Sequence, residues 1–496
     1  METRSLKFIA TACGGELLSG AGQTPVRRVC TDSRQAQAGD LFFALRGEHF
    51  DGHNFLDDAA RKGAVAVVVE VGREKGEGRK EKAGLPGRPA LALRTSHLGC
   101  AVVAVADTRK ALGRLAAEYR KDFGLPITAI GGSNGKTTTK DLVASVVKQK
   151  LATVWSEASF NNDIGVPLTL LKLGKTHQAA VLEVGTNHPG ELAPLVKMIQ
   201  PRYGVITSIG REHLEFFGDL AGVAREQAAL GELLPAQGKL FVNGDDAWTE
   251  GIAGRTRAAV VRAGFSDAND WRVRELRADQ HGVTFRVESP VADFAGEYRT
   301  HLLGRHQVLN ALFAVAVGVE LGLGREEIQR GLAECKAAKM RLQLWELNGG
   351  VQVLDDTYNA NADSMVAALQ TLQDLPCQGR RVAVLGEMAE LGAHSEAAHE
   401  EVGRRAAELG VGQLFAVGKM AALMARGARR AGLNRVLEFA DVETAATAVK
   451  SFLKSGDLLL LKASRVARLE RITERLRAGE APKALVAGRG TETVKC

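Results

Sequence analysis

The chain has 496 residues, a formal net charge of +7, 45% hydrophobic residues and 25% charged residues. This length exceeds what one hydrophobic core usually organises, so several domains are expected. The positive charge is spread along the chain and aromatic residues make up only 5%, too few for base-stacking surfaces. We therefore expect no nucleic-acid partner, and an anionic small substrate explains the charge as well.

The sequence carries no pattern typical of secretion or membrane insertion. Its first residues lack a continuous apolar core and a cleavage site, and no stretch of about 18 uncharged apolar residues occurs. Six scattered cysteines show no metal-ligand spacing and predict buried free thiols: Cys13, Cys30, Cys100, Cys335, Cys377 and Cys496. We expect a cytoplasmic protein without membrane insertion, and a monomer.

Residues 1–105 combine short apolar runs with glycine-rich turns and predict a small α/β domain. Strands are expected at 40–45 and 64–69, with a helix around 55–62. The charged, glycine-rich segment Arg73–Arg88 has no apolar period, which predicts a mobile surface insertion.

Two further α/β domains are predicted, over residues 106–323 and 324–496. In the first, buried strands at 127–130, 179–184, 205–209 and 240–242 alternate with helices, which is typical of a doubly wound, mostly parallel sheet. In the second, strands are expected at 351–354, 382–385, 414–417 and 458–461, as in a Rossmann-like domain. A final helix at 464–477 should pack Val466, Leu469, Ile472 and Leu476 against the core.

The sharpest motif is ITAIGGSNGKTT, residues 127–138, in which a strand runs into a glycine-rich turn and then a helix. Backbone N–H groups of such a turn and the positive end of the helix form a cradle for phosphate oxygens. Lys136 would reach the terminal phosphates, and the hydroxyl of Thr137 would bind Mg²⁺. The motif therefore predicts a nucleotide site, although Ile130 stands where the usual P-loop has its first glycine.

The loop alone leaves several functions open. It fits a kinase, a GTPase or a non-catalytic nucleotide-binding scaffold as well as a ligase. It does not fit a dinucleotide-binding domain, because GxGxxG with an acidic residue about 20 positions later is absent.

The remaining motifs resemble those of the Mur ligase family, in order and over nearly the whole chain. They are TDSR at 31–34, GDLFFALRG at 39–47, DGH at 51–53, SFNNDIGVPLT at 159–169, LEVGTNHPGE at 182–191, EHLE at 212–215, GRHQVLNA at 304–311, LDDTYNAN at 354–361, LGEMAELG at 385–392 and KASR at 462–465. The resemblance implies three domains: a small α/β domain for a UDP-linked substrate, a central P-loop domain and a C-terminal Rossmann-like domain.

The resemblance also implies an ATP site. Its loop residues would be Gly132, Ser133, Asn134, Gly135, Lys136, Thr137 and Thr138. Matching positions in the family place Asn310 beside the adenine, Asp356 at the ribose and Arg341 at the γ-phosphate. Lys136, Glu183, His213 and Arg341 would be the catalytic residues.

Magnesium is implied as the cofactor of ATP. Glu183 ends a buried strand at the edge where open α/β sheets place ligands, and its family counterpart binds Mg²⁺. The counterpart of His213 binds a second metal ion. With Thr137 and Gln227, these residues form the expected metal set. The family commonly has a carbamylated lysine where this chain has Gln227, and glutamine cannot be carbamylated, so we expect weaker dependence on bicarbonate.

The substrates implied are UDP-N-acetylmuramoyl-tripeptide and D-alanyl-D-alanine, joined through an acyl phosphate during peptidoglycan synthesis. Ser33, Arg34, Asp51, Asn161 and Asn162 would contact the nucleotide-linked substrate. Three residues would shape the dipeptide pocket: Asn359, Asn361 and Asp363. The alternative within the family is a ligase that adds the third residue of the precursor, but the LDDTYNAN and GEMAELG blocks favour the dipeptide-adding branch.

Overall fold

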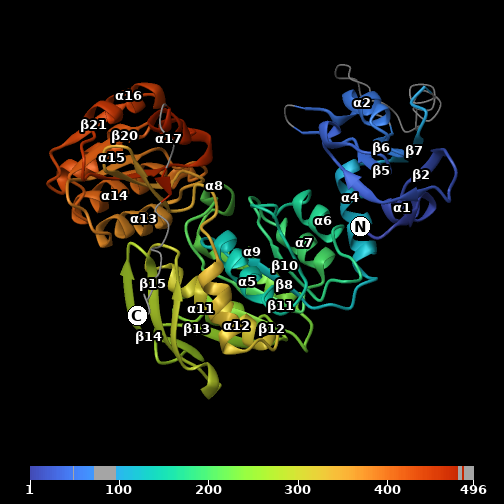
Figure 1. The fold of residues 1–496 in the computed structure, drawn as a ribbon, viewed down its shortest axis with the longest axis horizontal. Helices are drawn as coiled ribbons and strands as arrows, with labels where there is room; N and C mark the ends of the chain where they lie inside the picture. The colour runs from blue at the N-terminus through green and yellow to red at the C-terminus, as the bar shows by residue number, and fades with distance from the viewer. Residues whose placement is uncertain (48–49, 72–96, 479–482, 485–496) are drawn as a thin grey trace, which may run out of the picture. The chain divides into compact units, whose positions relative to one another are not determined.

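A computed structural model describes residues 1–47, 50–71, 97–478 and 483–484 of the chain (Figure 1). By its internal contacts the chain divides into two compact units. The first comprises Met1–Ala129, Leu151–Thr186 and Leu192–Tyr203, and the second Ile130–Lys150, Asn187–Glu191 and Gly204–Cys496. The predicted segment Arg73–Arg88 lies outside the described residues.

The N-terminal sheet of the first unit has five strands in the order β2-β7-β6-β5-β4. Its strands are β2 Glu16–Ser19, β4 Arg28–Cys30, β5 Asp40–Phe43, β6 Ala66–Glu70 and β7 Ala101–Val105. The last four are parallel and β2 is antiparallel to β7. Around it lie β1 Arg4–Ser5 paired with β3 Pro25–Val26, α1 Leu6–Cys13, α2 Leu56–Arg61, and the 3₁₀ turns η1 Ser33–Gln35 and η2 Gly52–Phe55.

A second group of elements in this unit packs around α4 Thr108–Arg120. This helix contacts α1, α6 Gly165–Leu170 and α7 Leu192–Ile199. Two parallel strands accompany it, β9 Thr153–Trp155 and β10 Ala179–Glu183. All five residues of β10 are buried, so the carboxylate of Glu183 is placed at the end of an apolar strand.

The central sheet has nine strands in the order β16-β15-β14-β13-β12-β11-β8-β10-β9. The strands not yet given are β8 Ile127–Gly131, β11 Tyr203–Ile206, β12 Lys239–Asn243, β13 Ala259–Gly264, β14 Trp271–Asp279, β15 Gly282–Glu288 and β16 Gly296–Thr300. The second unit also holds α5 Lys136–Val147, α8 Leu214–Phe217, α9 Leu220–Glu232, α10 Thr249–Ala253, α11 Gln307–Glu320 and α12 Arg325–Glu334. β14, β15 and β16 form an antiparallel extension that the sequence did not predict.

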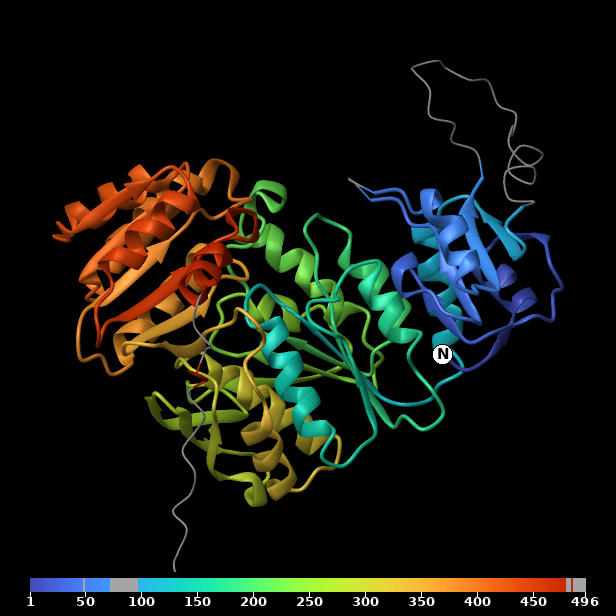
Figure 2. The same cartoon turned by 45° about the horizontal axis from the view of Figure 1, so that its top comes forward.

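The C-terminal sheet has seven strands in the order β21-β20-β19-β22-β18-β17-β23. These are β17 Gln343–Leu347, β18 Val351–Asp356, β19 Arg381–Leu385, β20 Gln413–Val417, β21 Val436–Phe439, β22 Leu458–Lys462 and β23 Lys483–Ala484. The five from β21 to β18 are parallel. One face packs on α13 Ala362–Asp374, α14 Ser395–Glu408 and α15 Ala421–Arg430, and the other on α16 Val442–Phe452 and α17 Glu470–Arg477 (Figures 1 and 2).

The predicted α/β class with mostly parallel sheets is confirmed, and two local predictions are wrong. The strand expected at 205–209 covers Tyr203–Ile206. The last helix begins at Glu470, because Arg468 adopts a left-handed backbone (φ 50°) that ends the preceding 3₁₀ turn. Val466 is consequently 68% exposed instead of packed in the core. No helix in the described part of the chain is long and apolar enough to cross a membrane.

Candidate active site

The predicted phosphate loop lies between β8 and α5, and two of its glycines are required by close approaches. Gly132 (φ 110°) and Gly135 (φ 83°) adopt backbone conformations that side chains disfavour. A Cβ atom on Gly132 would lie 2.3 Å from Oγ1 of Thr207, and one on Gly135 would lie 2.6 Å from Oδ1 of Asn310. A side chain at Gly132 would therefore displace the loop from Thr207, and one at Gly135 would displace it from Asn310.

The first half of the loop is held in place by hydrogen bonds that its backbone N–H groups donate to Gln227 and Ser208. The amide of Gly132 donates to Oε1 of Gln227 (2.8 Å), that of Ser133 to the carbonyl of Ser208 (2.8 Å), and that of Asn134 to Oγ of Ser208 (3.3 Å). The first N–H groups of a helix have no partner within it. The positive end of α5 at Gly135–Thr138 is therefore the part of the loop suited to phosphate oxygens.

Lys136 folds back over this loop. Its ammonium donates to the carbonyls of Gly132 (2.5 Å) and Ser133 (3.0 Å) and forms an ion pair with Oε2 of Glu212 (3.0 Å). Glu212 is buried, and its other oxygen accepts from the side-chain amide of Gln227 (3.1 Å). Sequence reasoning singled out Lys136 and Gln227 but missed Glu212, which lies in the EHLE motif directly before His213.

His213 lies at the start of α8 with a left-handed backbone (φ 47°). Its Nδ1 is 2.5 Å from Oε2 of Glu390, a close ion-pair contact that is not aligned as a hydrogen bond. This contact lowers the pKa of the Glu390 carboxyl. Glu390 belongs to the GEMAELG block, so the structure gives that block a position beside the predicted metal ligand.

The start of α13 is tied to the phosphate loop and to the segment after β11. The side-chain amide of Asn361 donates to Oδ1 of Asn134 (3.0 Å). Arg211 reaches Oδ1 of Asp363 with its side chain (2.7 Å) and Oδ2 with its backbone N–H (2.8 Å), and it also pairs with Glu401 (2.6 Å). Two of the three residues predicted for the dipeptide are thus beside the loop or its neighbouring segment.

Asn359, the third residue predicted for the dipeptide, shares a contact with Asp356 instead. Lys462 lies fully buried and donates to Oδ2 of Asp356 (2.5 Å) and to the carbonyl of Asn359 (3.0 Å). Loss of solvation lowers the pKa of Lys462, against the attraction of Asp356. The other oxygen of Asp356 accepts from the N–H of Leu342 (3.2 Å), so this carboxylate is fixed on both sides.

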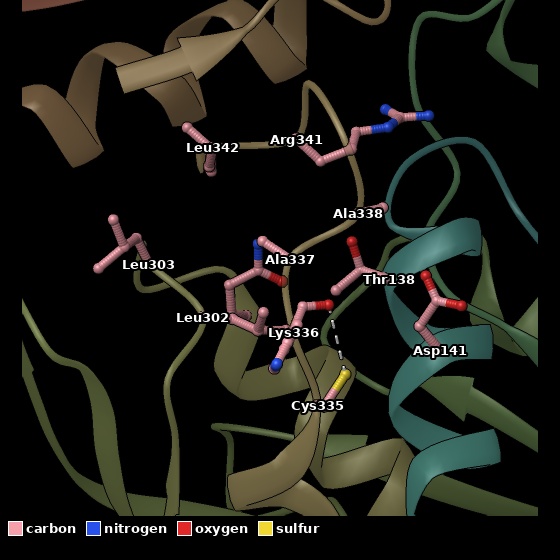
Figure 3. Close-up of a pocket in the computed structure, with 11 residues that line it drawn as sticks. Thr138, Asp141, Leu302, Leu303, Cys335, Lys336, Ala337, Ala338, Arg341 and Leu342 are labelled. Atoms are coloured by element: carbon pink, nitrogen blue, oxygen red, sulfur yellow. Dashed lines mark hydrogen bonds between the residues drawn. The ribbon is translucent and has the colours of Figure 1, made fainter. Parts of the chain in front are cut away.

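A small pocket lies between α5 and the segment 335–342 (Figure 3). Thr138 and Asp141 face it from the helix, while Arg341 extends from the loop and stacks on the ring of Tyr358 (4.2 Å). Its other lining residues are Leu302, Leu303, Gln307, Cys335, Lys336, Ala337, Ala338 and Leu342. The side-chain oxygen of Asn310 accepts from the hydroxyl of Thr139 (3.1 Å). The structure therefore brings Arg341 and Asn310 to the α5 end of the phosphate loop.

In the first unit, Glu183 is 1% exposed and only half of its carboxylate is satisfied. The side-chain amide of Asn161 donates to Oε1 (2.8 Å), whereas Oε2 is buried without a hydrogen-bond partner. Such an atom is costly unless something else binds it, and a carboxylate oxygen suits a cation. Asn162 has a structural contact, since its oxygen accepts from the N–H groups of Ile164 (3.1 Å) and Gly165 (2.9 Å) at the start of α6.

The N-terminal residues predicted for the substrate occupy two turns. Ser33 and Arg34 lie in η1, where Lys62 donates to both of their carbonyls (2.9 and 3.1 Å). Asp51 caps η2 and forms an ion pair with Arg46 (3.2 Å). The two turns thus have separate partners within the same unit.

The donor set fits magnesium in part. In the described part of the chain, no three His, Cys, Asp or Glu residues cluster as a metal site. Mg²⁺ is commonly held by one or two carboxylates together with substrate phosphates and water, so a dedicated cluster is not required. The buried, unpaired oxygen of Glu183 is the observation that favours such an ion.

Comparison with known proteins gives consistent matches along the chain. Family models match at residues 25–120 (Mur ligase family, catalytic domain), 130–318 (Mur ligase middle domain) and 340–465 (Mur ligase, glutamate ligase domain). The UDP-N-acetylmuramoyl-tripeptide--D-alanyl-D-alanine ligase of Escherichia coli (strain K12) is 35% identical over 479 residues, covering 95% of this chain and 98% of that protein.

Solved structures show the same fold. MurF from Acinetobacter baumannii matches with a TM-score of 0.83 and 31% identity, over 96% of this chain and 99% of that one. MurF ligase from Thermotoga maritima in complex with ADP matches with a TM-score of 0.74 and 25% identity, over 91% and 97%. The chain therefore belongs to the Mur ligase family, which has three α/β domains and forms amide bonds with the use of ATP.

Proposed function

We propose that this protein joins D-alanyl-D-alanine to UDP-N-acetylmuramoyl-tripeptide in the cytoplasmic stage of peptidoglycan synthesis. The observation that carries the proposal is the bond between Asn361 and Asn134, because it ties the LDDTYNAN block to the phosphate loop. The names and near-complete coverage of the relatives support the same substrates. We further propose domain limits of 1–105, 106–323 and 324–496, and a monomer.

In this proposal, the N-terminal end of α5 holds the phosphates of ATP. Lys136 neutralises the terminal phosphates, Arg341 contacts the γ-phosphate and Asp356 binds the ribose. Their side chains come from the loop, from the segment 335–342 and from the end of β18. The full nucleotide set is Gly132, Ser133, Asn134, Gly135, Lys136, Thr137, Thr138, Asn310, Arg341 and Asp356.

Magnesium would be held through Thr137, Glu183 and His213. When bound, it supplies positive charge that offsets the phosphate charge during phosphoryl transfer. Asn161 fixes one oxygen of Glu183 and leaves the other available. Glu390 holds the imidazole of His213 from one side.

The chemistry overcomes the poor reactivity of a carboxylate towards an amine. A carboxylate oxygen of the tripeptide attacks the γ-phosphorus of ATP, and the bond between that phosphorus and the bridging oxygen breaks to release ADP. The dipeptide amine then attacks the acyl carbon, loses a proton, and expels inorganic phosphate. Lys136 and Arg341 act here mainly by positioning and by neutralising charge.

The nucleotide-linked substrate would contact Ser33, Arg34, Asp51, Asn161 and Asn162. The incoming dipeptide would contact the C-terminal residues Asn359, Asn361 and Asp363. Asp363 is held by Arg211, so binding the dipeptide ammonium there would require this ion pair to open.

The test measures phosphate release from ATP with Mg²⁺ and UDP-N-acetylmuramoyl-tripeptide, with and without D-alanyl-D-alanine. We expect phosphate release to depend on D-alanyl-D-alanine. We expect no release when diaminopimelate or lysine is supplied together with the precursor that carries only two amino acids. Equal release without any amine would exclude ligation as the reaction.

A further inference from the structure

Gln227 projects from α9 into the interior beneath the phosphate loop and is 1% exposed. Both polar atoms of its amide are used. Oε1 accepts from the N–H of Gly132 (2.8 Å), and Nε2 donates to Oε1 of Glu212 (3.1 Å). The atom that a metal ion would need is therefore already committed to the loop backbone.

The contacts continue from Glu212 to the loop lysine. Oε2 of Glu212 pairs with the ammonium of Lys136 (3.0 Å), which also donates to the carbonyl of Gly132 (2.5 Å). The four residues thus form a closed ring, from the Gly132 N–H through Gln227, Glu212 and Lys136 back to the Gly132 carbonyl. We call these four residues the loop ring.

The charges of the loop ring balance only if position 227 is neutral. Glu212 contributes one buried negative charge and Lys136 one positive charge. A carboxylate at position 227 would place a second negative charge at about hydrogen-bond distance from Glu212, where the two like charges repel each other. An apolar side chain would leave the Gly132 N–H and one oxygen of Glu212 unpaired in a buried place.

We propose that Gln227 is a positioning residue of the phosphate loop, which orients Gly132 and Glu212 so that Lys136 is held ready for the nucleotide phosphates. It acts through these residues and does not bind the metal ion. The inference rests on the proposed ATP site and refines it. Its consequence is that Gln227 sets nucleotide affinity even when no divalent cation is present.

The experiment measures ADP affinity by calorimetry on the full-length protein, in Mg²⁺ and separately in EDTA. Gln227→Met keeps the side-chain volume and removes both hydrogen bonds. We expect it to weaken ADP binding by about tenfold, by the same factor in both buffers. A residue that bound the metal ion would show its loss only with Mg²⁺, and that result would overturn the proposal.

Gln227→Glu provides a second variant of nearly the same shape. Its side-chain oxygen can still accept from the N–H of Gly132, but the group that donates to Oε1 of Glu212 is replaced by an acceptor, so one contact of the loop ring is lost. We expect its ADP affinity to fall by about tenfold both with Mg²⁺ and in EDTA. ADP affinity equal to that of the unmodified protein would also overturn the proposal.

Gln413→Met is the matched control, because Gln413 is a buried glutamine of the C-terminal sheet that donates to the carbonyl of Leu414. It should bind ADP like the unmodified protein. If the unmodified protein binds no ADP, the proposed function itself fails. If that protein binds ADP and ligates but Gln227→Met binds it equally well, only the inference fails.

Discussion

The ammonium of Lys136 lies 3.0 Å from Oε2 of the buried Glu212, so the phosphate loop carries its own counter-ion in this structure. Binding of a polyphosphate at the start of α5 must share or displace this pairing. The lysine is thus held in place before the nucleotide arrives. Preorganised charge of this kind is what phosphoryl transfer requires.

Lys136→Ala should lower kcat/KM for ATP-dependent phosphate release at least about 100-fold, because the transferring phosphoryl group loses its nearest cation. Lys148→Ala, at the exposed C-terminal end of the same helix, should have little effect. Steady-state phosphate release measures both. Comparable rates for the two variants would remove Lys136 from the proposed chemistry.

Arg211→Met should lower the free energy of unfolding by about 1–3 kcal/mol, because Asp363 and Glu401 would both lose a shared, partly buried partner. Urea denaturation gives this value. Arg109→Met breaks an exposed pair with Asp163 and should cost less than about 1 kcal/mol. If the two variants lose equal stability, the Arg211 contacts do not contribute as a network.

Asn161→Leu should raise the Mg²⁺ concentration needed for half-maximal activity by about tenfold, because Glu183 would lose the donor that orients it. The KM for the nucleotide-linked substrate distinguishes the two roles open to Asn161. A change in that KM alone, with unaltered Mg²⁺ dependence, would assign Asn161 to substrate binding. Gln178→Leu, which removes an exposed acceptor of the Ala152 N–H in the same unit, is the control.

Removal of bicarbonate and dissolved carbon dioxide should leave activity nearly unchanged. Gln227 has no amine that carbon dioxide could modify, and its amide already bridges Gly132 and Glu212. Rates in degassed buffer with and without added bicarbonate test this expectation. A strong requirement for bicarbonate would refute it.

Cys335 should resist alkylation in the native protein. Burial raises its pKa from the usual 9.0 to about 12, so the reactive thiolate is scarce at pH 8. Because the folded state favours the protonated thiol, this contribution to stability is complete below pH 9 and is lost as pH rises towards 12. Mass spectrometry after iodoacetamide should find Cys335 unmodified after the partly exposed Cys100 and Cys377 have begun to be labelled. Early labelling of Cys335 would contradict the described burial.

The phosphate loop was predictable because glycine, lysine and the flanking apolar period act over about 20 consecutive residues. The partners of its residues were not. Glu212 lies 76 positions from Lys136 and Gln227 lies 95 positions from Gly132, and only the fold brings these pairs together. The same holds for the contacts of Lys462 with Asp356 and of Glu390 with His213. The sequence motifs that contain these residues were recognised, but their partners could not be predicted.

Local backbone choices set the other limit on prediction. The apolar spacing at 466–476 is that of a helix, but the left-handed conformation of Arg468 delays its start to Glu470. Because arginine rarely adopts a left-handed backbone, the sequence does not predict this conformation at Arg468. The antiparallel strands β14 to β16 likewise lack the strand-and-helix alternation that revealed the parallel parts of the sheets.

If a substrate carboxylate is activated by phosphorylation, one of its oxygen atoms must leave in the inorganic phosphate. UDP-N-acetylmuramoyl-tripeptide carrying ¹⁸O in its terminal carboxylate is incubated with ATP, Mg²⁺ and D-alanyl-D-alanine, and the inorganic phosphate released is analysed by mass spectrometry. We expect the phosphate to carry one ¹⁸O atom from the carboxylate and the peptide to be extended by D-alanyl-D-alanine. Phosphate free of the label would exclude an acyl phosphate as the intermediate.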